Sequence, residues 1–230
     1  MDSVIKLLTY THVLAGILSL IVAPIAMVVR KGASAHRLWG KIFFWSMAWI
    51  CFSAIVISVY KWIPFLLLLA VFSFYASYSG YRALYQKQIH LGKGVKWYDW
   101  TMAIVSGAFM LGFIVYGIYL VSTNQLGYFG YLSIGFGIGG SLTVWGELKN
   151  YIKPPTDKHN WLFAHLGSML GGFIASVTAF STQTMNFLPG AIQWIWPSLV
   201  GVPFIILWGR YYRRKLKAGT PITQLLEFKR

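Results

Sequence analysis

The chain has 230 residues, of which 57% are hydrophobic, 18% aromatic and only 11% charged. Soluble domains carry roughly a quarter of charged residues, so this composition excludes an ordinary soluble protein and predicts a polytopic membrane protein. The formal net charge of +15 would suggest a nucleic-acid partner in a soluble chain. Here the bases stand between apolar segments and at the C-terminus, which is typical of membrane topology and excludes nucleic acid. A single cysteine, Cys51, excludes a disulfide framework and a thiolate zinc site.

Seven apolar segments reach the roughly 20 residues that a membrane-spanning helix needs. The predicted spans are 4–29, 41–60, 64–84, 97–121, 127–148, 161–181 and 191–209. The expected fold class is therefore all-α, a seven-transmembrane-helix bundle. We expect a single domain over residues 1–209, followed by a basic cytoplasmic tail over residues 210–230.

The basic residues alternate between the connectors. All of them except Lys6 and Lys61 lie in or beside the connectors that follow the first, third and fifth spans, or beyond the seventh. Because basic connectors stay in the cytoplasm, the N-terminus is expected outside and the C-terminus inside. The tail segment RYYRRKLK is expected to lie on anionic lipid headgroups.

The first span carries a histidine in its outer half, His12. At 1.5 Å per helical residue it lies well over ~15 Å from the inner connectors, so it cannot share a compact site with residues there. Two interpretations stay open: a buried histidine bonded to a neighbouring helix, or a proton relay or axial haem ligand.

Two histidines are expected on the inner side of the membrane. His36 opens the second span, where the helix dipole disfavours an imidazolium and favours a neutral ring that can bind a ligand. His165 lies about a turn and a half inside the sixth span, and an ionisable residue inside a span is by default a candidate functional residue. His159, just before the sixth span, is a further candidate ligand that we expect at headgroup level.

Two carboxylates complete the set of polar candidates. Asp99 begins the fourth span, where it can cap the helix and complement its dipole. Glu147 ends the fifth span, where the dipole opposes a carboxylate, so it requires a cation. The candidates are a base such as Arg37, Arg82 or Lys158, a protonated histidine, or a bound metal.

Small residues repeat at helical spacing on several spans and are expected to face a common centre. They are Thr9, Gly16, Ser19, Ala23 and Ala26 in the first span; Ser73, Ser77 and Gly80 in the third; Gly130, Ser133, Gly137, Gly140 and Thr143 in the fifth; and Ser168, Gly172, Ala175 and Ala179 in the sixth. Close helix packing is the simplest reason for such residues. The cluster GFGIGG lies inside a span and is interpreted as a packing seam, since no strand precedes it.

Several short motifs occur in a characteristic order. They are the first-span histidine, an inner H-R-x-x-G at positions 36–40, and a sixth-span H-x-x-x-M (His165, Met169) followed by T-A-F at 178–180. In this combination the chain resembles a family of bacterial integral membrane proteins whose domain has no assigned function. The resemblance implies a bacterial cytoplasmic membrane and an acidic residue at the end of the fifth span, matched here by Glu147. Members often carry Arg three residues after the sixth-span histidine, where this chain has Ser168.

Four functions fit these residues. The first is a zinc-type metal site at the inner ends of the second, fifth and sixth spans, built from His36, Glu147 and His165 with His159 as a fourth candidate; such a metal could activate water for hydrolysis. The second is a b-type haem electron carrier ligated by His36 and His165. The third is a proton-coupled transporter with relay points at His12, Glu147 and His165. The fourth is a non-catalytic module for membrane binding or assembly, and a lipid or another small molecule is the expected kind of ligand.

Overall fold

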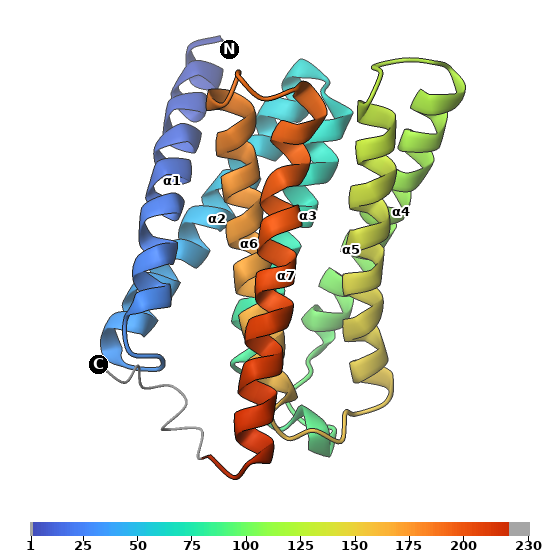
Figure 1. The fold of residues 1–230 in the computed structure, drawn as a ribbon. Coiled ribbons are helices and arrows are strands. Elements are labelled where there is room, and N and C mark those ends of the chain that lie inside the picture. The colour runs from blue at the N-terminus through green and yellow to red at the C-terminus, as the bar shows by residue number, and fades with distance from the viewer. Residues whose placement is uncertain (1, 221–230) are drawn as a thin grey trace.

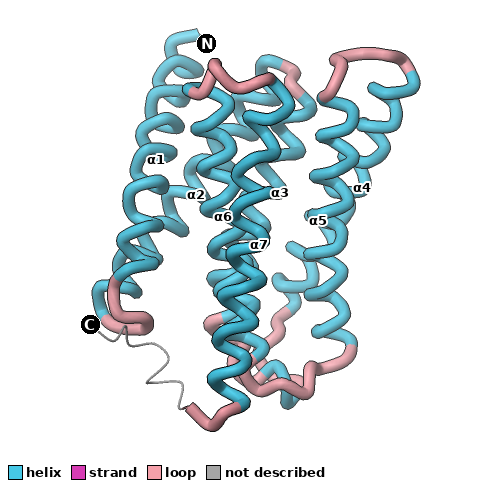
Figure 2. The backbone as a smooth tube through the Cα atoms, in the orientation of Figure 1, coloured by secondary structure: helices cyan, strands magenta, loops and turns pink. Residues whose placement is uncertain are grey.

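The computed structural model describes residues 2–220, and this part of the chain contains helices and no strand. Figures 1 and 2 show a bundle of long helices that run up and down alongside one another. The elements are α1 (Asp2–Val28), α2 (Ser34–Lys61), α3 (Pro64–Ala83), a short 3-10 helix η1 (Ile89–Leu91), α4 (Trp97–Ser122), α5 (Phe129–Ile152), α6 (Asn160–Thr184) and α7 (Gly190–Lys217). The all-α prediction is confirmed.

Six of the described helices, all except α5, are long and apolar enough to cross a membrane. Large apolar side chains also cover the outside of the bundle; Leu7 is 64% exposed and Leu199 69%. Such surfaces are stable in lipid and unfavourable in water, so the chain is an integral membrane protein. α5 is as long as its neighbours, but it is rich in glycine and polar residues, so the seventh crossing stays a prediction.

Two helices are longer than their predicted spans. α2 begins at Ser34, so His36 lies in its first turn. α7 runs on to Lys217 through RYYRRKLK, because this segment contains neither Gly nor Pro to stop it. The first eight residues of the predicted tail therefore belong to α7, and residues 221–230 lie outside the described part.

The helices form a central group flanked by two pairs. α1 packs on α2, α4 packs on α5, and α3, α6 and α7 lie between the two pairs. The connectors 29–33, 84–96 and 153–159 lie at one end of the bundle, together with residues 218–220 (Figure 1). We refer to this end, which carries most of the described connector bases, as the basic end.

An ion pair joins α3 to α4 at the basic end. Arg82 Nε donates to Asp99 Oδ1 at 2.6 Å and Arg82 Nη2 donates to Asp99 Oδ2 at 2.9 Å. Asp99 Oδ2 also accepts the backbone N–H of Lys96 at 2.8 Å, which satisfies a free donor at the start of α4. The predicted capping role of Asp99 is confirmed, and its side chain is fully buried.

Two glycines of the predicted stripe on α5, Gly130 and Gly137, face α4. A Cβ atom added at Gly137 would lie 2.6 Å from the Ile114 side chain, and one at Gly130 would lie 2.7 Å from Val121. These glycines therefore allow α5 to approach α4 closely, as small residues do in membrane helices. The expected packing seam is confirmed here, but the prediction that the whole stripe faces a common centre is wrong.

Candidate functional site

Two histidines from distant parts of the sequence meet near the basic end. The ring centroids of His36 on α2 and His165 on α6 are 6.3 Å apart, with the ring planes at 78°. His36 Nδ1 donates to the carbonyl of Ala26 on α1 at 2.9 Å, and His165 Nδ1 donates to the carbonyl of Gly80 on α3 at 2.7 Å. The pair thus ties four helices together, and we call it the histidine pair.

The hydrogen bonds of the histidine pair determine which nitrogen is available. A carbonyl oxygen only accepts, so each Nδ1 carries its hydrogen, and a neutral ring then leaves Nε2 as a bare lone pair. No described residue forms a hydrogen bond with either Nε2 atom. Metal-binding histidines are usually oriented by a carbonyl or carboxylate in this way.

Lys31 lies beside the histidine pair, between α1 and α2. Its ammonium group donates to the carbonyls of Ala26, at 3.3 Å, and of Met27 at the end of α1. The Ala26 carbonyl is therefore shared with His36. Burial lowers the pKa of the Lys31 ammonium to about 8, because a charged amine loses its hydration there.

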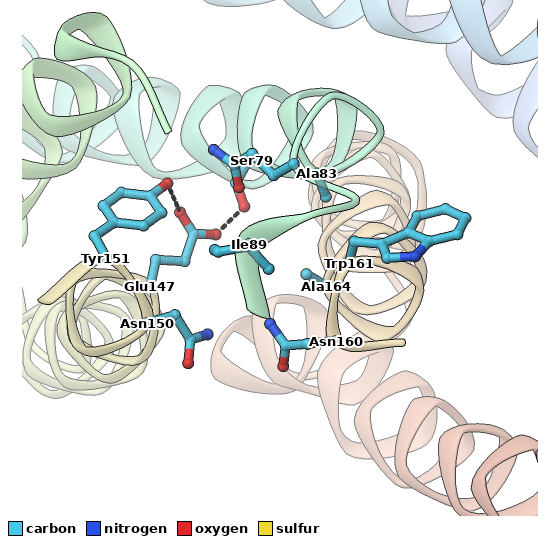
Figure 3. Close-up of a pocket in the computed structure, with 10 residues that line it drawn as sticks. Ser79, Ala83, Ile89, Glu147, Asn150, Tyr151, Asn160, Trp161 and Ala164 are labelled. Atoms are coloured by element: carbon cyan, nitrogen blue, oxygen red, sulfur yellow. Dashed lines mark hydrogen bonds between the residues drawn. The ribbon is translucent and has the colours of Figure 1, made fainter. Parts of the chain in front are cut away.

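Glu147 is surrounded by hydroxyl groups from two helices. Tyr75 donates to Glu147 Oε2 at 2.7 Å, Tyr151 donates to the same oxygen at 3.3 Å, and Ser79 donates to Oε1. Ser79 Oγ also lies 3.2 Å from Ser168 Oγ on α6. Figure 3 shows Glu147 pointing from α5 towards Ser79, with Tyr151 beside it. We call these five residues the Glu147 network.

The cation predicted next to Glu147 is not found among the described residues. Hydroxyl donors satisfy the carboxylate instead, and Arg82, one of the predicted partners, pairs with Asp99. The sequence could not reveal this, because Tyr75 and Ser79 come from α3, about 70 positions away, and nothing in the sequence shows that α3 and α5 lie side by side.

The structure brings together two of the three predicted metal ligands. The part of the chain that is described contains no group of three or more His, Cys, Asp or Glu side chains placed to hold a metal ion. His36 and His165 meet, whereas Glu147 bonds to hydroxyls. The centres are nonetheless neighbours, because Ser79 bonds to Glu147 and the adjacent Gly80 bonds to His165.

The other two histidines named from the sequence lie elsewhere. His159 is the N-cap residue of α6; its backbone N–H donates to Asp157 Oδ1 at 2.8 Å and its ring Nδ1 lies 3.7 Å from the same oxygen. His12 Nδ1 lies 2.8 Å from Ser53 Oγ on α2. This is the hydrogen bond to a neighbouring helix that one interpretation of His12 expected.

A large cavity separates the central helices from α5. It has a volume of about 820 Å³ and is lined by residues of α3 to α7, which is within the range of ~300–1,000 Å³ typical of ligand sites. Apolar side chains form most of its wall, among them Leu69, Phe72, Phe136, Ile174, Trp194 and Ile205. Tyr75 and Ser168 also line it, so the cavity reaches the Glu147 network.

Glycines form part of the cavity wall. A Cβ atom added at Gly135, Gly139 or Gly167 would meet nothing within 4 Å, and all three residues line the cavity. These glycines differ from Gly137, which is pressed against α4. The cavity was not predicted from the sequence, although Gly135 and Gly139, four residues apart on α5, were the available signal.

The Glu147 network also borders a second, smaller pocket on the side of the basic end. This pocket has a volume of about 20 Å³ and is lined by Ser79, Glu147, Tyr151, Asn160 and Trp161 among others (Figure 3). Such a volume is large enough for about one water molecule. The Glu147 network therefore borders both the apolar cavity and a small pocket near the basic end.

Comparison of the chain with protein-family models, with curated proteins and with solved structures finds no match.

Proposed function

We propose that this protein binds a lipophilic small molecule inside the membrane, with the apolar body of the ligand in the cavity and its polar head at the Glu147 network. The observation that carries the proposal is the cavity of about 820 Å³, which is apolar along most of its wall and meets hydroxyl groups at one end. Binding sites for small molecules combine an apolar enclosure with a few convergent polar groups.

The glycines that line the cavity support the interpretation that this space is left free for a ligand. Packing glycines admit a neighbouring helix, as Gly137 admits α4, whereas Gly135, Gly139 and Gly167 have open space beside them. An empty apolar volume of this size would forgo many dispersion contacts. Four of the five helices that line the cavity, α3, α4, α6 and α7, are long and apolar enough to cross a membrane, so its occupant is expected to enter from the bilayer.

The binding of tritiated hexadecanol tests this function. The full chain is reconstituted in phosphatidylcholine nanodiscs, and the probe bound by empty nanodiscs is subtracted. We expect saturable binding of about one hexadecanol per protein, because the site is a single defined cavity. Binding that rises linearly with probe and equals partition into empty nanodiscs would contradict the proposal.

The proposal also includes the orientation of the helix bundle in the membrane and the membrane in which it lies. The basic end would face the cytoplasm of a bacterial cell, since basic connectors are retained there. The C-terminal turns of α7 would lie on anionic headgroups; there Arg213 already covers the ring of Phe163 at 4.5 Å. The Glu147 network would then lie near the inner leaflet.

The histidine pair supports a second candidate function, the binding of a transition metal or haem iron. A metal held at ~2.1 Å by both Nε2 atoms would keep the ring centroids ~5–6.5 Å apart, and the observed separation is 6.3 Å. Two imidazoles are enough for haem ligation, whereas zinc would require further ligands. Glu147 has no part in this site.

Metal analysis and an optical spectrum of the purified protein test the second candidate. We expect about one equivalent of zinc, copper or iron in the wild type, lost in both His36→Ala and His165→Ala. His12→Ala is the matched control, because His12 also lies within a helix and bonds to a neighbouring helix through Nδ1, to Ser53, but it does not belong to the histidine pair; it should retain the metal. A wild-type protein without stoichiometric metal after incubation with these ions would rule the site out.

A further inference from the structure

The directions of the hydrogen bonds in the Glu147 network select the chemistry of the ligand head. Tyr75, Ser79 and Tyr151 all donate to the carboxylate of Glu147. A serine hydroxyl has one hydrogen, and that of Ser79 is directed at Glu147. In the 3.2 Å contact between Ser79 Oγ and Ser168 Oγ, Ser168 is therefore the donor.

All the hydroxyl hydrogens of the network thus point towards the carboxylate and away from the cavity. Tyr75 and Ser168, which line the cavity, are left with oxygen lone pairs for a ligand. Thr143 and Thr178 line the cavity too, and their hydroxyls donate to Gly139 and Ile174 carbonyls of their own helices. They also present only acceptors.

The Glu147 network also contains no basic side chain. No basic side chain of the described residues forms an ion pair with Glu147, and the nearby guanidinium of Arg82 is paired with Asp99. The network therefore offers no cationic donor to an anionic ligand head.

We infer that the ligand is an amphiphile whose head donates hydrogen bonds, either a hydroxyl or an ammonium group, and that Ser168 accepts from it at the inner end of the cavity. This inference rests on the proposed function and adds the class of ligand. At the Glu147 network this arrangement disfavours free carboxylates, ethers, esters and quinone carbonyls, because these heads only accept hydrogen bonds.

Competition among three probes of equal chain length tests the inference. Tritiated hexadecanol bound to the protein in phosphatidylcholine nanodiscs is displaced by unlabelled hexadecanol, hexadecyl methyl ether or palmitate. We expect the ether and palmitate to compete at least about tenfold more weakly than the alcohol, because an unpaired buried acceptor is left behind. An ether or palmitate that competes as well as the alcohol would overturn the inference while leaving the proposed function intact.

The variant Ser168→Ala tests whether Ser168 is the group that distinguishes the alcohol from the ether. In Ser168→Ala the alcohol and the ether should bind within about twofold of each other, because the group that separates them is gone. Ser198→Ala is the matched control, a cavity-lining serine on α7 outside the network, and it should keep the full difference. A difference retained in Ser168→Ala would show that Ser168 is not the acceptor. Absence of saturable hexadecanol binding in the wild type would instead defeat the proposed function itself.

Discussion

The double variant Gly139→Leu, Gly167→Leu is expected to lose hexadecanol binding by about tenfold or more, which corresponds to ~1.4 kcal/mol or more. Both glycines line the cavity from opposite sides, on α5 and α6, and neither has an atom within 4 Å of where a Cβ would be. Two leucine side chains would therefore extend into the volume that the ligand needs, and their Cβ atoms would meet no protein atom within 4 Å. Equilibrium binding to nanodiscs measures the loss.

The control for this variant is Gly146→Leu. Gly146 also lies on α5 and has open space beside its Cα atom, but it does not line the cavity. Replacing glycine by leucine favours a helix by up to ~1 kcal/mol, so all these variants should fold. Unchanged binding in the double variant, or an equal loss in Gly146→Leu, would show that the ligand does not occupy the cavity.

The variant Asp99→Asn is expected to lower the free energy of unfolding by about 3 kcal/mol, the cost of leaving a buried charge without its partner. Asp99 is fully buried, and the Arg82 side chain is only 12% exposed, so water replaces the lost carboxylate poorly. The variant also weakens the bond to the Lys96 N–H that begins α4. Denaturation in increasing fractions of dodecyl sulfate, followed by circular dichroism, measures the change.

Asp157→Asn provides the comparison for the ion pair. Asp157 lies in the connector just before α6, with its Oδ1 3.7 Å from His159 Nδ1, but its side chain is 45% exposed, so its loss should cost less than about 1 kcal/mol. The double variant Arg82→Met, Asp99→Leu should recover most of the loss, because no uncompensated charge remains. Equal effects of Asp99→Asn and Asp157→Asn would mean that the buried ion pair contributes little.

The helices could be predicted because their signal is local. Long apolar segments between basic connectors define a helical membrane protein, and the described helices match the expected ones with changes only at the ends. The start of α2 and the end of α7 were misplaced, because hydropathy detects where lipid ends and not where the helix ends. Polar helical turns such as those around His36 and after Gly209 carry no apolar signal.

The candidate site could be predicted only in part. That His36 and His165 come together follows from the cost of isolated ionisable groups in a membrane, but the partner of Glu147 depends on which helices are neighbours. The packing of the α4–α5 pair against α3 places Tyr75 and Ser79 beside Glu147. The sequence also does not show whether a given glycine faces a neighbouring helix, as Gly137 does, or a cavity, as Gly139 does.

An experimental density map of the protein in a phosphatidylcholine nanodisc with hexadecanol would show whether the cavity holds a ligand. We expect one elongated feature between α5 and the α3, α6 and α7 group, ending within hydrogen-bonding distance of Ser168. Side chains of α5 and α7 in direct contact there, with Gly139 and Gly167 covered by protein atoms and no room for a ligand, would contradict the proposed function.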